Sequence, residues 1–228
     1  AFFNFIQLHL MRYNNAEIFI NGPDGKLEAK YIQSKKDNAP IALILHPHPE
    51  YGGTMNNRVT YNAFHAFLQN EFSVCRFNFR GVGKSEGKFD NGLGELSDAA
   101  AALDFIQRSN PNSNESWVVG FSFGALICMQ LLMRRPEIFR FVSISPQPNI
   151  FDFNFLAPCP TSGLVIHGNQ DQLVTDEAIK SLKAKLTNQK KIAVDFSEIK
   201  GADHFFLNKD KEFIKVLDTY IKKESRFF

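Results

Sequence analysis

Residues 117–124 read Trp-Val-Val-Gly-Phe-Ser-Phe-Gly, and a long apolar stretch follows them. The apolar run up to Gly120 predicts a buried strand, and residues 123–134, apolar nearly all round, predict a helix inside the fold. Ser122 therefore lies at a sharp turn that strains its backbone, where side chains in place of Gly120 and Gly124 would collide with the neighbouring strand and helix. The turn raises the Ser122 hydroxyl above the sheet, beside the positive end of the helix, and makes it a candidate nucleophile.

Strand-like and helix-like patterns alternate along the rest of the chain. The predicted strands cover residues 16–20, 26–33, 41–46, 73–79, 117–120, 141–145, 163–167 and 191–199, and the predicted helices cover 58–70, 95–108, 123–134, 176–186 and 208–222. A hairpin followed by repeated β–α units predicts one mainly parallel sheet with helices on both faces. Ligands bind beyond the carboxyl ends of the strands in such sheets, so functional residues should lie in loops that follow strands.

Two side chains after Ser122 are candidates for the rest of a catalytic set, because a serine hydroxyl needs a base to remove its proton. His204 lies in the loop between the last predicted strand and the last predicted helix, which makes it the best candidate base. Asp171 follows the preceding strand and would hold the tautomer of the imidazole. Asp152 and Asp203 remain alternatives for the acid, although the Asp203 side chain should point away from that of its neighbour His204.

Backbone donors for an oxyanion are expected in two places. The first is the N–H of Phe123, the residue after the candidate nucleophile. The second should come from the loop after the strand at 41–46, where Pro47 and Pro49 lack an N–H and leave His48 between them as the donor. Tyr51, in the same loop, is the alternative.

Three other patterns in the sequence do not indicate a function. His46 and His48 resemble a pair of metal ligands, but no further ligands with compatible spacing accompany them, so neither a metal nor a cofactor is expected. Residues 80–85 end in Gly-Lys-Ser like a phosphate-binding loop, yet Asn78 stands where that motif needs glycine. The cysteines are too few and too scattered for a disulfide framework and are expected to be reduced and mostly buried: Cys75, Cys128 and Cys159.

The composition and length of the chain limit its expected binding partners and domain organisation. The 228 residues include 26 Lys plus Arg and 24 Asp plus Glu, which gives a net charge of +2 and no electrostatic case for nucleic acid or an anionic membrane. We expect an N-terminal extension at residues 1–12 and a single domain at residues 13–228. The sequence shows no targeting signal and no apolar stretch long enough to span a membrane, so we expect a cytoplasmic protein.

The motifs together resemble one known family. They are residues 46–49 with the glycines at 52–53, residues 79–85, the Gly-x-Ser-x-Gly turn, Asp171, and the pair Asp203 and His204. With them the chain resembles the α/β-hydrolase superfamily, and more narrowly a group of small bacterial dienelactone-hydrolase-like or predicted esterase proteins, over about residues 16–222. The resemblance implies an eight-stranded, mainly parallel sheet and a Ser–His–Asp hydrolase. Dienelactone hydrolases themselves use a cysteine nucleophile, so Ser122 favours ordinary ester chemistry.

The link between the strands at 141–145 and 163–167 is too short for the helical cap domain that some of these hydrolases carry. Apolar residues of this link could wall an acyl pocket, join the core or form a dimer contact: Phe151, Phe153, Phe155 and Leu156. The leading hypothesis is a serine hydrolase that cleaves small carboxylic esters through an acyl-enzyme on Ser122. Amide cleavage or acyl transfer by the same residues, and a non-catalytic binding protein, are the alternatives.

Overall fold

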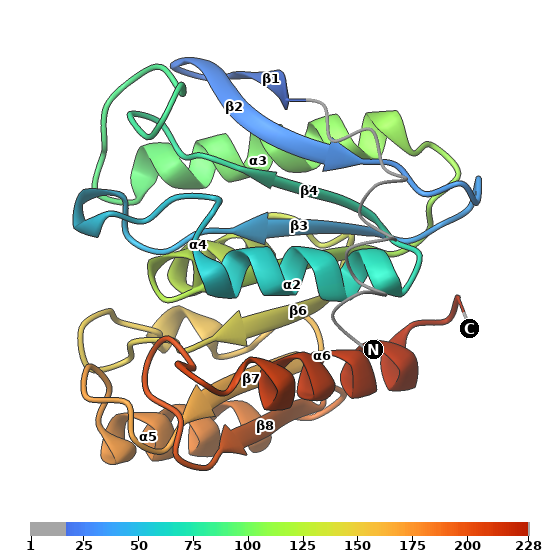
Figure 1. Ribbon diagram of the computed structural model, residues 1–228. Helices are drawn as coiled ribbons and strands as arrows, with labels where there is room; N and C mark the ends of the chain where they lie inside the picture. The colour runs from blue at the N-terminus through green and yellow to red at the C-terminus, as the bar shows by residue number, and fades with distance from the viewer. Residues whose placement is uncertain (1–16, 228) are drawn as a thin grey trace.

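A computed structural model describes residues 17–227, and its centre is a single twisted sheet (Figure 1). The strands stand in the order β1-β2-β4-β3-β5-β6-β7-β8. Their bounds are β1 Glu17–Gly22, β2 Gly25–Ile32, β3 Ile41–Leu45, β4 Ser73–Phe77, β5 Ser116–Phe121, β6 Ile138–Ile144, β7 Gly163–Gly168 and β8 Val194–Ile199. The expected N-terminal extension at 1–12 lies outside the described residues.

The sheet is mainly parallel. The hairpin strand β2 pairs antiparallel with both β1 and β4, and every pairing from β4 through β8 is parallel. The strands β3, β4 and β5 are buried almost completely, as continuous apolar runs with both faces covered require. The parallel strands labelled in Figure 1 point to the left, so the loops that follow them gather along one edge. The predicted eight-stranded sheet and its hairpin are confirmed.

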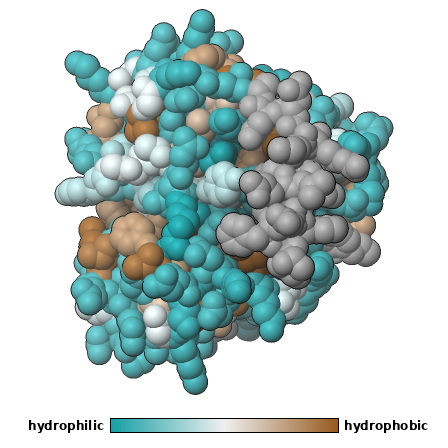
Figure 2. Space-filling model, viewed as in Figure 1, coloured by the Kyte–Doolittle hydropathy of each residue, from teal (hydrophilic) through white to brown (hydrophobic). Residues whose placement is uncertain are grey.

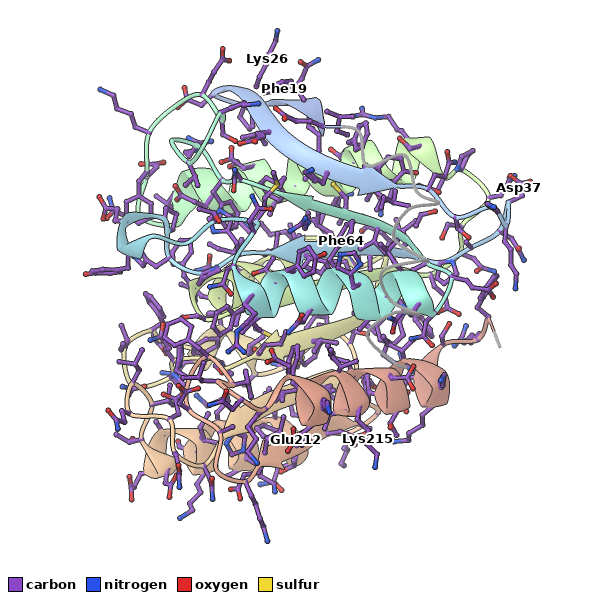
Figure 3. All side chains as sticks on the ribbon, viewed as in Figure 1. Phe19, Lys26, Asp37, Phe64, Glu212 and Lys215 are labelled. Carbon is purple, nitrogen blue, oxygen red and sulfur yellow. The ribbon has the colours of Figure 1, made fainter. Side chains whose placement is uncertain are left out.

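Helices cover both faces of this sheet. Their bounds are α2 Arg58–Gln69, α3 Leu93–Ser109, α4 Phe123–Leu132, α5 Asp176–Thr187 and α6 Asp210–Glu224. The helices α2 and α6 pack on one face, where Phe64 of α2 points toward the sheet (Figure 3). The helices α3, α4 and α5 contribute the apolar core on the other face. Nine of the ten residues of α4 are buried, which agrees with a helix apolar on all sides.

The link between β6 and β7 forms no cap domain. It contains one short 3-10 helix, η2 at Asn154–Leu156. Phe153 and Leu156 are buried in the core, and Phe151 and Phe155 are half-buried against it. None of the helices within residues 17–227 is long and apolar enough to cross a membrane.

Candidate active site

Ser122 stands in the tight turn between β5 and α4, with φ of 57° and ψ of −114°. This left-handed backbone is strained for serine and needs close packing on both sides to persist. A Cβ on Gly120 would lie 2.0 Å from the carbonyl oxygen of Gly124, and a Cβ on Gly124 would lie 2.5 Å from the carbonyl oxygen of Leu45. Because all these neighbours are backbone atoms, only glycine fits at both positions, as the sequence predicts.

The structure brings the three expected side chains together from three separate loops. The Nε2 atom of His204 lies 3.0 Å from the Oγ atom of Ser122. The Nδ1 atom of His204 lies 2.7 Å from Oδ2 of Asp171. A carboxylate can only accept hydrogen bonds, so Nδ1 carries the proton and the lone pair of Nε2 faces the serine hydroxyl. The imidazole is therefore set to take the proton of Ser122.

Hydrogen bonds from neighbouring residues hold Asp171 and His204 in these positions. The Oδ1 atom of Asp171 accepts from the N–H groups of Leu173 at 2.8 Å and Val174 at 3.2 Å. Ser145, at the end of β6, donates its hydroxyl to the backbone carbonyl of His204 at 3.0 Å. The side chains of both triad candidates are buried, at 2% exposure for Asp171 and 4% for His204. The side chain of Asp171 and the backbone of His204 are thus each held by groups outside the triad.

The two alternative acids serve other purposes. Asp152 is exposed, and its Oδ1 accepts from the N–H of Asn154 at the start of η2. Asp203 accepts from the N–H groups of Phe205 and Leu207 and so holds the turn after His204. None of these three hydrogen bonds leads to the imidazole.

The loop after β3 lies against the start of α4, where the two expected oxyanion donors belong. The N–H of Phe123 is in the first turn of α4 and has no acceptor within the helix. In the part of the chain that the structure describes, the N–H of His48 donates to no acceptor. The N–H of Tyr51 donates to the carbonyl of His48 at 3.2 Å, so the alternative donor is occupied. The ring of His48 stands 4.9 Å from the ring of Phe123.

Two residues shape this loop. A Cβ on Gly53 would lie 2.1 Å from the carbonyl oxygen of Pro47, so the loop can close on itself only with glycine there. His46 is fully buried, and its Nε2 accepts from the N–H of Phe79 at 3.0 Å while its Nδ1 lies 2.6 Å from the Pro47 carbonyl. Burial lowers the pKa of His46 to about 4, so the imidazole is neutral and can accept and donate at once. His46 is thus a structural tie between the loops after β3 and β4.

The structure also places the histidine pair, the cysteines and the loop at residues 80–85. Within residues 17–227 no three His, Cys, Asp or Glu side chains gather as a metal site. The three cysteines are free and buried, and burial raises the pKa of Cys75 to about 12. The loop at 80–85 is anchored by Arg80, whose guanidinium forms two hydrogen bonds with buried Asp98 of α3. No helix follows that loop directly, which excludes a phosphate-binding P-loop.

One contact of the nucleophile is not indicated by the sequence. Gln147, two residues after Ser145 at the end of β6, lies with Oε1 3.1 Å from Oγ of Ser122. The rule that placed the acid and the base in loops after strands applies to this position as well. The sequence analysis does not find Gln147 because a glutamine side chain has no titratable group that would mark it as a catalytic candidate.

The fold and these contacts define a hydrolase: a strand–turn–helix serine, with a histidine and an aspartate from later loops of the same parallel sheet. The family model of the alpha/beta hydrolase fold matches residues 50–163. The chain belongs to the alpha/beta hydrolase fold family.

Three relatives match this chain over more residues than the family model does. An uncharacterized protein of Rickettsia prowazekii is 51% identical over 209 residues, which are 90% of this chain and 88% of that protein. A crystal structure of a protein of unknown function from Agrobacterium tumefaciens is 51% identical, with a TM-score of 0.89 over 91% of this chain and 95% of that one. The third, a serine hydrolase without a lid from Xanthomonas campestris, is 30% identical, with a TM-score of 0.84 over 93% and 96% of the two chains.

Proposed function

We propose that this protein is a cytoplasmic serine hydrolase that cleaves small carboxylic esters through an acyl-enzyme on Ser122. The observation that carries the proposal is the buried hydrogen-bonded chain from Asp171 through His204 to Ser122, with distances of 2.7 Å and 3.0 Å. The three free, buried cysteines are in keeping with a reducing compartment.

The chemistry follows from the orientation of each group. Oγ of Ser122 attacks the carbonyl carbon of the ester while Nε2 of His204 takes the hydroxyl proton. Asp171 stabilises the imidazolium that forms. The tetrahedral intermediate expels the alcohol, which receives the proton from His204, and leaves an ester on Ser122. Water then attacks this ester and gives a proton to His204, which passes it to Oγ of Ser122 as the carboxylic acid is released.

The oxyanion of the intermediate would lie between the N–H groups of Phe123 and His48. Both come from backbone that is fixed by close packing, since the turn at Gly124 rests on Leu45 and the loop closes at Gly53. Donors held in place before the reaction need no reorganisation as charge develops, which is why such sites are effective.

Aromatic and aliphatic side chains surround the nucleophile. The half-buried ring of Phe89 stands 5.0 Å from the ring of His48, and that of Phe151 stands 6.3 Å from the ring of Phe123. The loops that follow the parallel strands and the start of α3 also carry exposed apolar side chains: Tyr51, Leu93, Ile150, Leu173, Phe205 and Leu207. Apolar patches are visible at the edge where these loops gather, on the left of Figure 2. Such surroundings favour an ester with an apolar acyl or alcohol group.

Labelling with a fluorophosphonate probe tests the proposal. We expect the wild-type protein to be labelled on one serine and Ser122→Ala to be unlabelled. The wild type should also hydrolyse p-nitrophenyl esters in preference to the matching anilides and show no dependence on an acceptor alcohol. Labelling that persists in Ser122→Ala would place the nucleophile elsewhere, and a preference for anilides or for transfer to an alcohol would replace ester hydrolysis by the alternative reaction.

A further inference from the structure

Gln147 is a buried polar side chain in contact with the reacting oxygen. Its carboxamide lies 3.1 Å from Oγ of Ser122, and the residue is 8% exposed. It approaches from the loop after β6, whereas the oxyanion loop approaches from β3, on the opposite side of β5. Buried polar groups are kept where their hydrogen bonds are made, so this contact is an integral part of the nucleophile's surroundings.

The backbone on both sides of Gln147 is fixed. Pro146 and Pro148 flank it, and each proline ring locks its own φ angle. The carbonyl of Gln147 accepts from the N–H groups of Ile150 at 3.0 Å and Phe151 at 2.9 Å. A side chain that starts from so rigid a backbone reaches Ser122 with little freedom to move away, and this makes the contact suitable for positioning.

The single proton of the Ser122 hydroxyl determines which end of the Gln147 carboxamide must face Oγ during the reaction. The hydroxyl has one proton and two neighbours that could receive it, Nε2 of His204 at 3.0 Å and Oε1 of Gln147 at 3.1 Å. Because Asp171 keeps the proton of His204 on Nδ1, Nε2 can only accept, so the reactive hydroxyl must point at His204. A carboxamide also has an N–H end, and rotation about its last torsion exchanges the two ends.

We propose that Gln147 is a positioning residue whose carboxamide N–H donates to Oγ of Ser122 and so directs the serine proton to His204. This inference rests on the proposed role of Ser122 as nucleophile. In the orientation that the structure shows, the amide oxygen faces Oγ at 3.1 Å and accepts its proton, so the serine is activated only once the amide has turned. The orientation of one amide thus sets the fraction of the enzyme that is ready to react.

Two substitutions at the same position separate donation from packing. Gln147→Leu removes both polar ends. Gln147→Glu is nearly the same size, and its carboxylate can only accept, so it draws the serine proton away from His204. Gln69→Leu, an exposed glutamine at the end of α2, is the matched control. Each protein is titrated with a fluorophosphonate to obtain the limiting rate constant of labelling and the half-saturating concentration, and thermal melting shows whether it is folded.

We expect Gln147→Leu to lower the limiting rate constant about tenfold and Gln147→Glu about a hundredfold, as loss of one neutral and misdirection by one charged hydrogen bond imply. The half-saturating concentration should stay within about twofold, and Gln69→Leu should match the wild type. A Gln147→Glu protein that reacts as fast as the wild type overturns the proposal even if Gln147→Leu fails to fold, because packing alone then explains the residue. A wild type unlabelled at Ser122 overturns the proposed function as well, so the two failures differ.

Discussion

Asp171→Asn offers a sharp test of the triad because the backbone decides which way the new amide must face. In the wild type Oδ1 accepts from the N–H groups of Leu173 and Val174, and Oδ2 faces Nδ1 of His204. An asparagine can satisfy the two backbone donors only with its oxygen. Its NH2 group then faces the imidazole, and Nδ1 must become the acceptor.

The expected loss follows from this exchange of tautomers. When Nδ1 of His204 accepts from Asn at position 171, the imidazole proton moves to Nε2, and the lone pair that should take the proton of Ser122 is gone. Triads with this change lose about 10⁴-fold in kcat, which corresponds to about 5 kcal/mol in the activation barrier. The fold should be retained, because the side chain stays in place with the same shape and the same two backbone hydrogen bonds.

The assay is steady-state hydrolysis of p-nitrophenyl acetate at pH 8, with circular dichroism to show that each variant is folded. Asp152→Asn is the matched control, because within residues 17–227 that carboxylate hydrogen-bonds only locally, to the N–H of Asn154. It should keep kcat within about twofold. A folded Asp171→Asn protein that retains more than about a tenth of the wild-type kcat would refute the role of this carboxylate in setting the tautomer.

Three further predictions concern the backbone around the oxyanion and the stability of the fold. His48→Pro should lower kcat/KM about a hundredfold relative to His48→Ala in ester hydrolysis, since both lose the ring but only proline loses the N–H; equal rates would reassign the donor. Gly124→Ala should lower kcat about a hundredfold, because its Cβ would lie 2.5 Å from the Leu45 carbonyl oxygen and must shift the start of α4; an unchanged kcat would count against this packing. The pKa of His46, lowered by burial to about 4, implies that the unfolded chain binds a proton that the folded chain refuses as pH falls from 6.5 to 4. His46 should therefore account for a fall of about 3 kcal/mol in the free energy of unfolding over that window, measured with urea as the difference between the wild type and His46→Gln, and a His46→Gln protein with the same pH slope as the wild type would contradict it.

Most of the fold could be predicted because strands buried on both faces are nearly free of polar residues. Two strands begin three residues away from the predicted start. β6 begins at Ile138 rather than residue 141, since the guanidinium of Arg140 pairs with Glu224 of α6 and can therefore stand in a strand. β8 begins at Val194 rather than residue 191, because Lys191 has a φ of 73°, which no strand accommodates.

Some residues of the candidate site could be placed from the sequence, and others could not. Ser122, Asp171 and His204 could be placed together from sequence because parallel strands deliver their following loops to one edge of the sheet. The contact of Gln147 with Ser122 and the pairing of Arg80 with Asp98 could not, since side chains far apart in sequence meet only through the packing of complete loops.

The short link between β6 and β7 bears on the fate of the covalent intermediate. Over the described residues this link forms no domain over Ser122, so in the proposed reaction no cap would keep water from the ester once the alcohol has left. Water is by far the most abundant acceptor around any protein, and an unroofed intermediate partitions toward it. The esterase proposed above would therefore favour breaking esters over exchanging them, and evolving a transferase from it would first require a structure that keeps the solvent out.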